Sequence, residues 1–324
     1  MKKVLFATTA LIASAGIASA QGVEVSGFAE LGIFDPDTAD SNVQFHTDID
    51  VTFTMSGETD AGLTFGASID LDESDGDGQF NSPAFDADTE GGESIFISGT
   101  FGTLTMGDTD GAFDRAMTEA IIGGSIQDDH EHEGYNGNAG LDGTYDGQVA
   151  RYDYSFGDFG FSVSGEVADS GDGDPVLGLG VTYAAALGGV DLGFGLGYQT
   201  VDTGAIDGDI IGVSVDASFA GGFQAIFNYS TADVDVFAED PEHFGIALGY
   251  SVDALTVAVN YGDYSDWELR TDPGDADSSG LGLIVNYDLG GGAEIQFGVG
   301  DNDRDEADGG VDTTTYSLGL ALSF

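Results

Sequence analysis

The chain has 324 residues and a formal net charge of −53 at pH 7, with 59 acidic residues against six lysines and arginines. So few cations cannot neutralise a track of phosphates, which excludes nucleic acid as a partner. The chain has no cysteine, so hydrogen bonds and packing have to hold the fold together without disulfides. Its 53 glycines and 22 phenylalanines argue against simple disorder in spite of the charge.

The first twenty residues have the three parts of a secretory signal peptide. Lys2 and Lys3 form a basic start, residues 4–17 an apolar stretch and residues 18–20, Ala-Ser-Ala, a small-residue exit. This pattern predicts cleavage before Gln21. Cleavage would remove two lysines and no acids, and would therefore change the charge from −53 to −55. No later apolar run reaches the roughly 18 residues that a transmembrane helix needs.

After this segment, apolar and polar residues alternate over stretches of about ten residues. Residues 43–56 read VQFHTDIDVTFTMS, so one parity is largely apolar while the other carries His46, Asp48 and Asp50. A period of two over whole segments predicts β-strands with one apolar and one polar face. We predict sixteen strands, at residues 23–34, 43–56, 62–72, 93–100, 103–107, 148–156, 159–167, 175–185, 188–200, 209–220, 223–233, 243–252, 254–264, 278–288, 292–301 and 314–324.

The connections between these strands alternate between short turns and long acidic loops. Seven short turns, such as 186–187 and 289–291, and eight long loops place both ends of the chain on the short-turn side. An outer-membrane barrel with an even number of strands has this arrangement. A soluble β-sandwich would show a similar alternation, because its apolar parity faces a core.

The positions of the aromatic residues favour the membrane barrel over the soluble sandwich. Aromatic girdles mark the two membrane interfaces of such barrels, and they lie on the apolar parity near the strand ends. The candidates near the short turns are Phe156, Phe159, Phe219, Phe223 and Phe324, and those near the loops are Phe34, Tyr198, Phe244 and Tyr261.

The longest connection, residues 108–147, contains only one cation, Arg115. Loops this long inside a compact domain are usually functional. We expect this one, the third on its side of the barrel, to fold inward and narrow a water-filled pore. Its acids are Asp108, Asp110, Asp114, Glu119, Asp128, Asp129, Glu131, Glu133, Asp142 and Asp146.

The polar parity of the predicted strands is acidic as well. Rings of aspartate and glutamate select cations, so these residues predict a cation-preferring pore. The competing interpretation is that the acids only hydrate a wide lumen. Arg151 shares its parity with Asp153 and is expected to point into the lumen. The acids on this parity are Glu24, Glu30, Asp48, Asp50, Asp70, Asp72, Glu166, Asp191 and Asp216.

One run in the long loop has the residue types of a metal site. Carboxylates suit Ca²⁺ or Mg²⁺, and histidines would admit transition metals. A solvated charge run is the competing interpretation. No cofactor is required by any motif, but acids packed this densely repel one another unless cations neutralise them, so we expect non-specifically bound Ca²⁺. The run consists of Asp128, Asp129, His130, Glu131, His132 and Glu133.

Several stretches resemble the trimeric sixteen-stranded general porins of alphaproteobacteria. They are residues 51–68, VTFTMSGETDAGLTFGAS; 99–108, GTFGTLTMGD; 287–294, YDLGGGAE; 300–303, GDND; and the terminal Phe324. The order and spacing of these stretches carry the resemblance, which covers residues 21–324. It implies an all-β, antiparallel transmembrane barrel with an inward-folded third external loop.

The resemblance also implies a homotrimer in the bacterial outer membrane, in contact with lipid and lipopolysaccharide, that lets small hydrophilic solutes and cations diffuse passively. In such porins, acids on the loop face arginines on the opposite wall. The arginine positions correspond here to Asp48 and Asp50, so this sequence departs from the family pattern. The candidate constriction residues are Asp108, Asp110, Asp114, Arg115, Glu119, His46, Asp48, Asp50 and Arg151.

Two other functions fit part of the sequence. A substrate-specific channel, for sugars or particular cations, would line its path with aromatics such as Tyr135, Tyr145 or Trp267. An outer-membrane enzyme would need a nucleophile and a base on the rim, and the sequence offers no such pair. Glycine repeats at 178–180 and 193–197 lie on predicted strands with no following helix, so they indicate small residues on the inner face rather than a dinucleotide motif.

Overall fold

The structure is a computed structural model that describes residues 22–35, 37, 43–72, 92–126, 141, 148–168, 173–202, 207–266, 277–304 and 312–324. Within these residues it contains sixteen β-strands and one short helix. No helix in this part of the chain is long and apolar enough to cross a membrane. In chain order the elements are β1 (Gly22–Asp35), β2 (Gln44–Glu58), β3 (Thr64–Asp72), β4 (Ser94–Gly99), β5 (Gly102–Asp108), α1 (Ala112–Ala116), β6 (Gln148–Phe156), β7 (Phe159–Glu166), β8 (Val176–Leu187), β9 (Val190–Asp202), β10 (Asp207–Phe219), β11 (Phe223–Val234), β12 (Glu242–Val252), β13 (Leu255–Ser265), β14 (Ser278–Gly290), β15 (Ala293–Arg304) and β16 (Thr313–Ser323).

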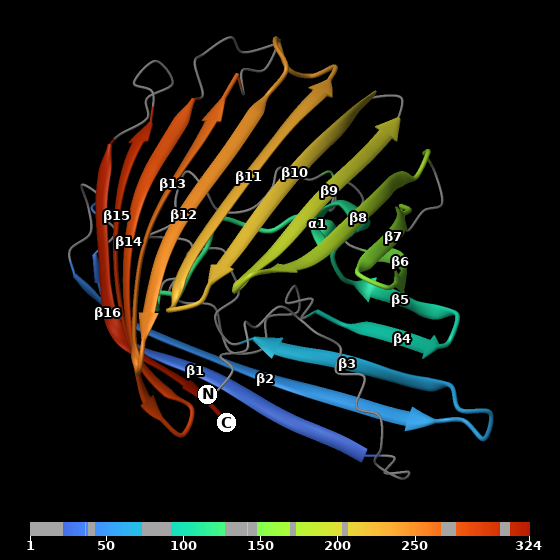
Figure 1. Ribbon diagram of the computed structural model, residues 1–324, viewed down its shortest axis with the longest axis horizontal. Coiled ribbons are helices and arrows are strands. Elements are labelled where there is room, and N and C mark those ends of the chain that lie inside the picture. Colours follow the sequence, from blue (N-terminus) through green and yellow to red (C-terminus); the bar gives the residue numbers. More distant parts are fainter. Residues whose placement is uncertain are drawn as a thin grey trace.

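These strands close into one antiparallel barrel, in which each strand pairs with its neighbours in the sequence and β1 pairs with β16 (Figure 1). In the closing pair, Ala29 lies opposite Leu322. Beyond the last strand, the Phe324 N–H donates to the Gly27 carbonyl at 2.8 Å. Closure leaves no open sheet edge, so the backbone can be satisfied inside hydrocarbon. The predicted all-β barrel is therefore confirmed.

Each observed strand begins and ends within three residues of its predicted range. One turn is displaced by two residues where two glycines follow a strand. The turn predicted at 186–187 lies at Gly188 and Gly189, which have φ angles of 59° and 98°. Glycine adopts this left-handed backbone without steric cost, so β8 continues to Leu187 before the chain reverses. At the turn before β15, β14 likewise continues two residues beyond its predicted end, to Gly290.

The two faces of the wall differ as expected for a barrel in a membrane. Large apolar side chains are exposed on the outer face, as in Phe45 with 87% and Ile95 with 67% of its surface accessible. Polar side chains such as Asn228 and Ser317 are buried on the inner face. A soluble sandwich would bury its apolar parity instead. The apolar parity of the sequence therefore faces outward, where lipid would cover it.

Aromatic residues near the short turns lie on this outer face and are exposed, as Phe156 and Phe324 show. Phe34 differs from the prediction because it is buried. It shares the inward parity of Glu30, and its ring meets the His46 ring edge-on at a centroid distance of 6.1 Å. The assignment of Phe34 to a girdle is therefore wrong: its parity, rather than its aromatic character, decides which face it occupies.

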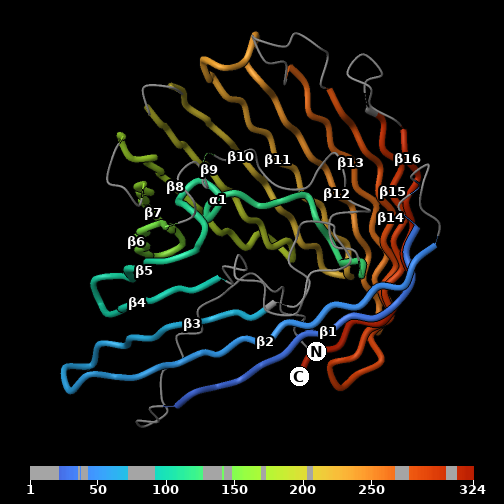
Figure 2. Tube along the Cα trace, turned by 180° about the vertical axis from the view of Figure 1, so that it is seen from behind, coloured from blue at the N-terminus to red at the C-terminus, as the bar shows by residue number. Residues whose placement is uncertain are grey.

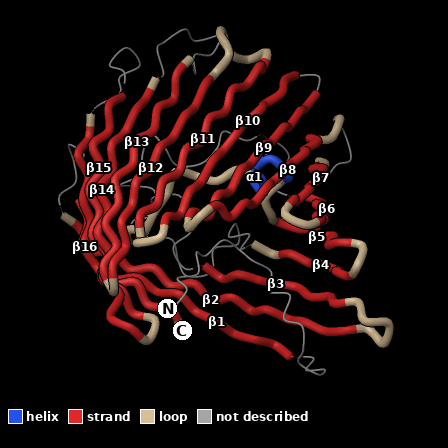
Figure 3. Tube along the Cα trace, in the orientation of Figure 1, coloured by secondary structure: helices blue, strands red, loops and turns tan. Residues whose placement is uncertain are grey.

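Helical structure is confined to one place in the described chain. Figure 3 shows α1 as a single short helix beside the strands, in the connection between β5 and β6. This connection contains the long acidic stretch singled out from the sequence, and its described part is residues 109–126 and 141. Residues 109–126 are called the inner segment below.

Candidate functional site: the inner segment and the facing wall

The inner segment leaves β5 and lies against the face of the strands that carries the buried polar side chains. Figure 2 shows α1 and the chain after it crossing strands β8 to β13. Its first contacts are with β7 and β8, and its last described residue, Ile126, contacts Gly319 on β16 and Gly32 on β1. Fourteen residue steps after Ala112 reach about 45 Å when largely extended, which is enough to cross this many strands.

The segment has one apolar and one polar side. Ala112, Phe113, Ala120 and Ile126 are fully buried. The charged residues point elsewhere, since Arg115 and its acidic neighbours are mostly exposed. Burying the apolar side against the wall is favourable by about 1.5–3 kcal/mol for each large side chain. This burial holds the segment against the wall and leaves its charges accessible to solution.

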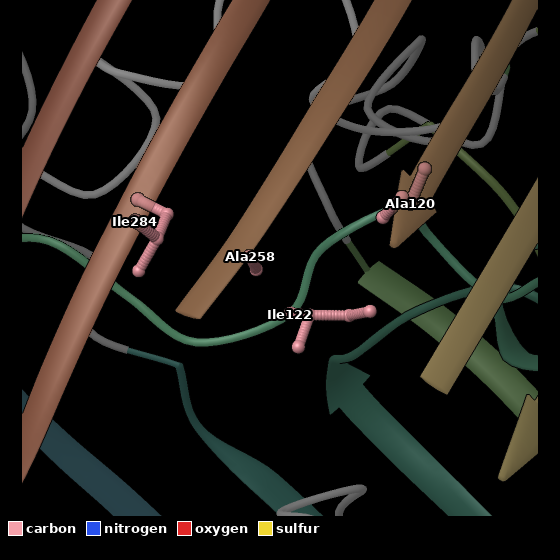
Figure 4. Close-up of a cluster of buried hydrophobic side chains, with 5 residues drawn as sticks. Ala120, Ile122, Ala258 and Ile284 are labelled. Atoms are coloured by element: carbon pink, nitrogen blue, oxygen red, sulfur yellow. The ribbon is translucent and has the colours of Figure 1, made fainter. Parts of the chain in front are cut away.

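Two hydrophobic clusters join the segment to the wall. In the first, Phe113 and Met117 pack with Ile210, Ala232 and Val234 from β10 and β11. In the second, Ala120 and Ile122 pack with side chains from β12, β13 and β14 (Figure 4). The wall residues of this second cluster are Ala247, Ala258 and Ile284. Both clusters are on the inner face, which is otherwise polar.

Polar wall side chains hold the beginning and middle of the segment by its backbone. The Ala112 N–H donates to the Ser164 hydroxyl oxygen at 2.8 Å. The Thr118 N–H donates to the Ser214 hydroxyl oxygen at 3.0 Å, and the Asn228 amide donates to the Thr118 carbonyl at 3.2 Å. Non-helical backbone at this depth needs such partners, because no sheet ladder satisfies it.

The same arrangement holds the end of the described segment. The Asn286 side chain both accepts from the Gly124 N–H at 3.2 Å and donates to the Gly124 carbonyl at 2.8 Å. Further along the connection, the Leu141 N–H donates to the Gln199 side-chain oxygen at 2.7 Å. Sequence reasoning missed these amide and hydroxyl residues. Their signal was weak, because they are isolated polar residues on a parity that on these strands is mostly glycine and apolar residues.

Arg151 ties the start of the segment to β6. Its Nε donates to Asp153 Oδ2 at 3.0 Å, and its Nη1 donates to the Thr109 hydroxyl at 3.3 Å and to the Asp110 carbonyl. The side chain is mostly buried. Asp153 in turn accepts from the Ser162 hydroxyl at 2.6 Å. Much of the Arg151 charge is therefore balanced locally by Asp153 and the Asp110 carbonyl.

The other candidate residues on this connection are more accessible. Asp108 is the last residue of β5 and is exposed, as are Asp110, Arg115 and Glu119. Asp114 is half-buried within α1. The structure therefore brings the acids and Arg115 onto one connection, with their charged groups on the side away from the hydrophobic contacts.

The candidates on β1 and β2 form a second group. Glu30 and Asp48 are cross-strand partners, and both are mostly buried. His46 Nε2 lies 3.6 Å from Glu30 Oε2. Asp48 Oδ1 has no hydrogen-bond partner in the part of the chain that the structure describes. Like charges opposite one another repel, so this pair creates a strongly negative patch unless cations or the His46 imidazole screen it.

Several predicted sites lie outside the described residues. They include the signal segment, the candidate metal run 128–133, and the aromatic candidates Tyr135, Tyr145 and Trp267. Of the acids on the strands, Asp70 accepts from the Thr52 hydroxyl at 3.0 Å, so it faces the same way as its neighbours on β2.

Comparison with known proteins agrees with this geometry. A model of the Gram-negative porin family matches residues 7–307. The porin of Rhodobacter capsulatus is 32% identical, over 88% of this chain and 96% of that protein. A solved porin aligns over 94% of this chain and 100% of its own, with a TM-score of 0.69 and 24% sequence identity. A mutant porin of Rh. blastica aligns over the same shares of the two chains, with a TM-score of 0.68 and 19% sequence identity. The solved structures establish the fold. The family model and the Rhodobacter capsulatus relative establish the family. The chain belongs to the Gram-negative porin family, and is therefore an outer-membrane channel for passive diffusion and not an enzyme.

Proposed function

We propose that the protein forms a cation-preferring pore for small hydrophilic solutes and ions. In this proposal, the third external loop folds inward and its inner segment narrows the pore opposite the wall of β1 to β3. The observation that carries the proposal is the charge on this wall. Glu30, Asp48 and Asp50 occupy the inward face, and Asp48 and Asp50 stand at the positions that correspond to arginines in the family pattern.

The positive charges near the proposed constriction do not offset these acids. Arg151 is paired with Asp153 at 3.0 Å. Arg115 is exposed, but Asp110, Asp114 and Glu119 accompany it on the same segment. A narrow channel with low-dielectric walls concentrates the field of such groups and raises the local concentration of cations. Anions therefore meet an electrostatic barrier that a pore with an arginine cluster lacks.

The test is the reversal potential of the reconstituted protein in a salt gradient. We expect the sign of a cation-selective channel. The double substitution Asp48→Asn/Asp50→Asn should lower the cation-to-anion permeability ratio severalfold, because it removes two charges at the constriction. Asp60→Asn is the matched control, since Asp60 lies in the exposed turn between β2 and β3. A wild-type channel that prefers chloride would refute the proposed selectivity.

A size series of solutes distinguishes a general pore from a substrate-specific one. In liposome swelling, a general pore gives rates that decline smoothly with solute mass. A solute that permeates much faster than its size predicts, with saturable kinetics, would instead assign the protein to the specific channels.

We further infer a homotrimer embedded in outer-membrane lipid and lipopolysaccharide, after export directed by residues 1–20. A groove of about 500 Å³ on the outer face supports an apolar contact surface there. It is lined by side chains of β1 to β4, including Val23, Met55, Phe65 and Ile95. Conductance that steps in threes would test the trimer.

We also propose that the acidic loops bind Ca²⁺. Thermal stability that falls when a chelator is added would test this binding.

A further inference from the structure

The inner segment lies on a row of glycines. Gly180 is on β8, Gly195 and Gly197 are on β9, and Gly212 is on β10. None of them has the positive φ angle that would itself require glycine. Glycine weakens a strand interior and often marks a place where another backbone approaches closely. The reason for glycine at these positions therefore has to lie in the atoms that pack against them on the inner face.

That space is filled by the inner segment. A Cβ added to Gly195 would lie 2.0 Å from the Ala116 carbonyl oxygen, and one added to Gly180 would lie 2.2 Å from the Ala112 carbonyl oxygen. Non-bonded carbon contacts are most favourable at about 3.5–4.0 Å. A carbonyl oxygen is fixed by its peptide plane and cannot rotate away like the end of a side chain. A methyl group at either position would therefore displace the segment's backbone.

The neighbouring glycines meet side chains of the segment. A Cβ at Gly197 would lie 2.6 Å from the Phe113 ring, and one at Gly212 would lie 2.7 Å from Met117 Cε. Phe113 is fully buried, so its ring has little room to move. Methionine is flexible and can adapt to an added methyl group.

The row continues along the path of the segment. A Cβ at Gly245 would lie 2.9 Å from the Ala120 Cβ and 2.8 Å from Asn228 Oδ1 of the wall, and one at Gly249 would lie 2.7 Å from the Ile122 Cγ2. Both glycines are on β12. The missing side chains therefore follow the segment from strand to strand, and the hydrogen bonds that the Thr118 and Gly124 N–H groups donate to Ser214 and Asn286 hold it along the same path.

We propose that these glycines are positioning residues that set the distance between the inner segment and the wall, and with it the width of the pore. The inference rests on the proposed role of this segment as the constriction. It adds that the pore width depends on glycines of β8, β9, β10 and β12, because the lack of a side chain at these positions lets the segment lie close to the wall. A wall of alanines would hold the same segment roughly 1.5 Å nearer the pore axis, the shift needed to restore an ordinary contact distance at Gly180 and Gly195.

The test uses the whole protein reconstituted in planar bilayers and in liposomes. The variant is Gly180→Ala/Gly195→Ala, which adds two methyl groups beneath the carbonyls of α1. We expect single-channel conductance to fall by roughly a third, as a narrower filter requires. Permeation of a trisaccharide should fall more than that of a monosaccharide, since only a narrower pore discriminates by size.

Gly165→Ala is the matched control. Gly165 is on β7, and a Cβ there would meet Leu177 Cδ2 at 3.7 Å and the Val176 carbonyl oxygen at 3.9 Å, both ordinary contacts. This variant should conduct like the wild type. If the double variant does not fold, Gly212→Ala replaces it, because flexible Met117 can absorb part of the clash. This variant should show a smaller fall in conductance with the same sign.

The outcomes separate the two proposals. A wild-type protein that forms no pore would refute the proposed function. A wild-type pore whose conductance and size discrimination are unchanged in the glycine variants would overturn this inference alone. A rise in conductance would also overturn it, because the segment would then have detached rather than moved toward the axis.

Discussion

Arg151 connects the wall to the root of the inner segment. Its guanidinium shares its hydrogen bonds between Asp153 on its own strand and Thr109 and the Asp110 carbonyl on the segment. A hydrogen bond from a charged donor contributes about 1.5–3 kcal/mol, more than a neutral one. Arg151 therefore restrains the segment where it leaves β5, in addition to any effect of its charge on ions.

Substitution of Arg151 tests this restraint. Arg151→Gln should weaken the attachment of Thr109 and Asp110 by about 1.5–3 kcal/mol, the contribution of the lost charged donor. The segment should then fluctuate more, and open-channel current noise should increase. Arg115→Gln removes the same charge from an exposed position and should leave the noise unchanged. Equal noise in the two variants would show that Arg151 acts only through its charge.

At the scale of elements, the inner segment is largely extended, but its backbone forms no β-sheet hydrogen bonds with a neighbouring strand. It has buried side chains along one side, and its backbone is hydrogen-bonded to the side chains of Ser164, Ser214, Asn228 and Asn286. Only five of its residues form a helix. A five-residue helix is too short to be stable alone, so tertiary contacts hold it in place.

The Asn286 clamp allows a test of this view. Asn286→Ala removes both hydrogen bonds to Gly124 and should destabilise the seated end by about 2 kcal/mol, taking about 1 kcal/mol for each. Backbone amides near Gly124 should then exchange with deuterium more than tenfold faster. Thr103→Val is the control, since it removes one hydrogen bond to Ser98, at 2.8 Å, within the β4–β5 pair. If the amides near Gly124 exchange at the same rate in both variants, the two Asn286–Gly124 hydrogen bonds do not hold this end of the segment.

At the scale of the whole molecule, net charge determines how selectivity responds to salt. The field of a chain with a charge of −53 extends through solution, and the Debye length shortens from about 10 Å at 0.1 M to about 3 Å at 1 M. We expect the cation-to-anion permeability ratio to fall severalfold across this range at a constant concentration gradient. A ratio independent of salt would indicate contact sites in the constriction rather than a long-range field.

The barrel was predictable because the two faces of each strand contact different environments, lipid outside and the aqueous interior inside, and the side chains alternate accordingly. Alternation with a period of two identified every described strand, and only the ends moved by up to three residues. Phe34 was misassigned when its residue type was weighed before its parity. The turn at Gly188 and Gly189 was displaced because two consecutive glycines allow the strand to continue before reversing.

The candidate site was predictable only in part. The acids, Arg115 and Arg151 could be found from composition and parity. The seat of the inner segment could not, because it joins Ala116 to Gly195 and Gly124 to Asn286, residues far apart in the chain. In the sequence, the glycines of β8 and β9 indicated small side chains on the inner face without indicating what covers them.

Local alternation and charge thus determined the fold class, the two faces of the wall and the acidity of the pore, because each depends on single residues and their spacing. Only the closed barrel decided where the inner segment rests, which polar groups hold it and which wall positions must lack a side chain. Closure brings β7 and β16 within reach of one short segment. The distances that define the proposed constriction are therefore set by packing across the barrel rather than by any local pattern.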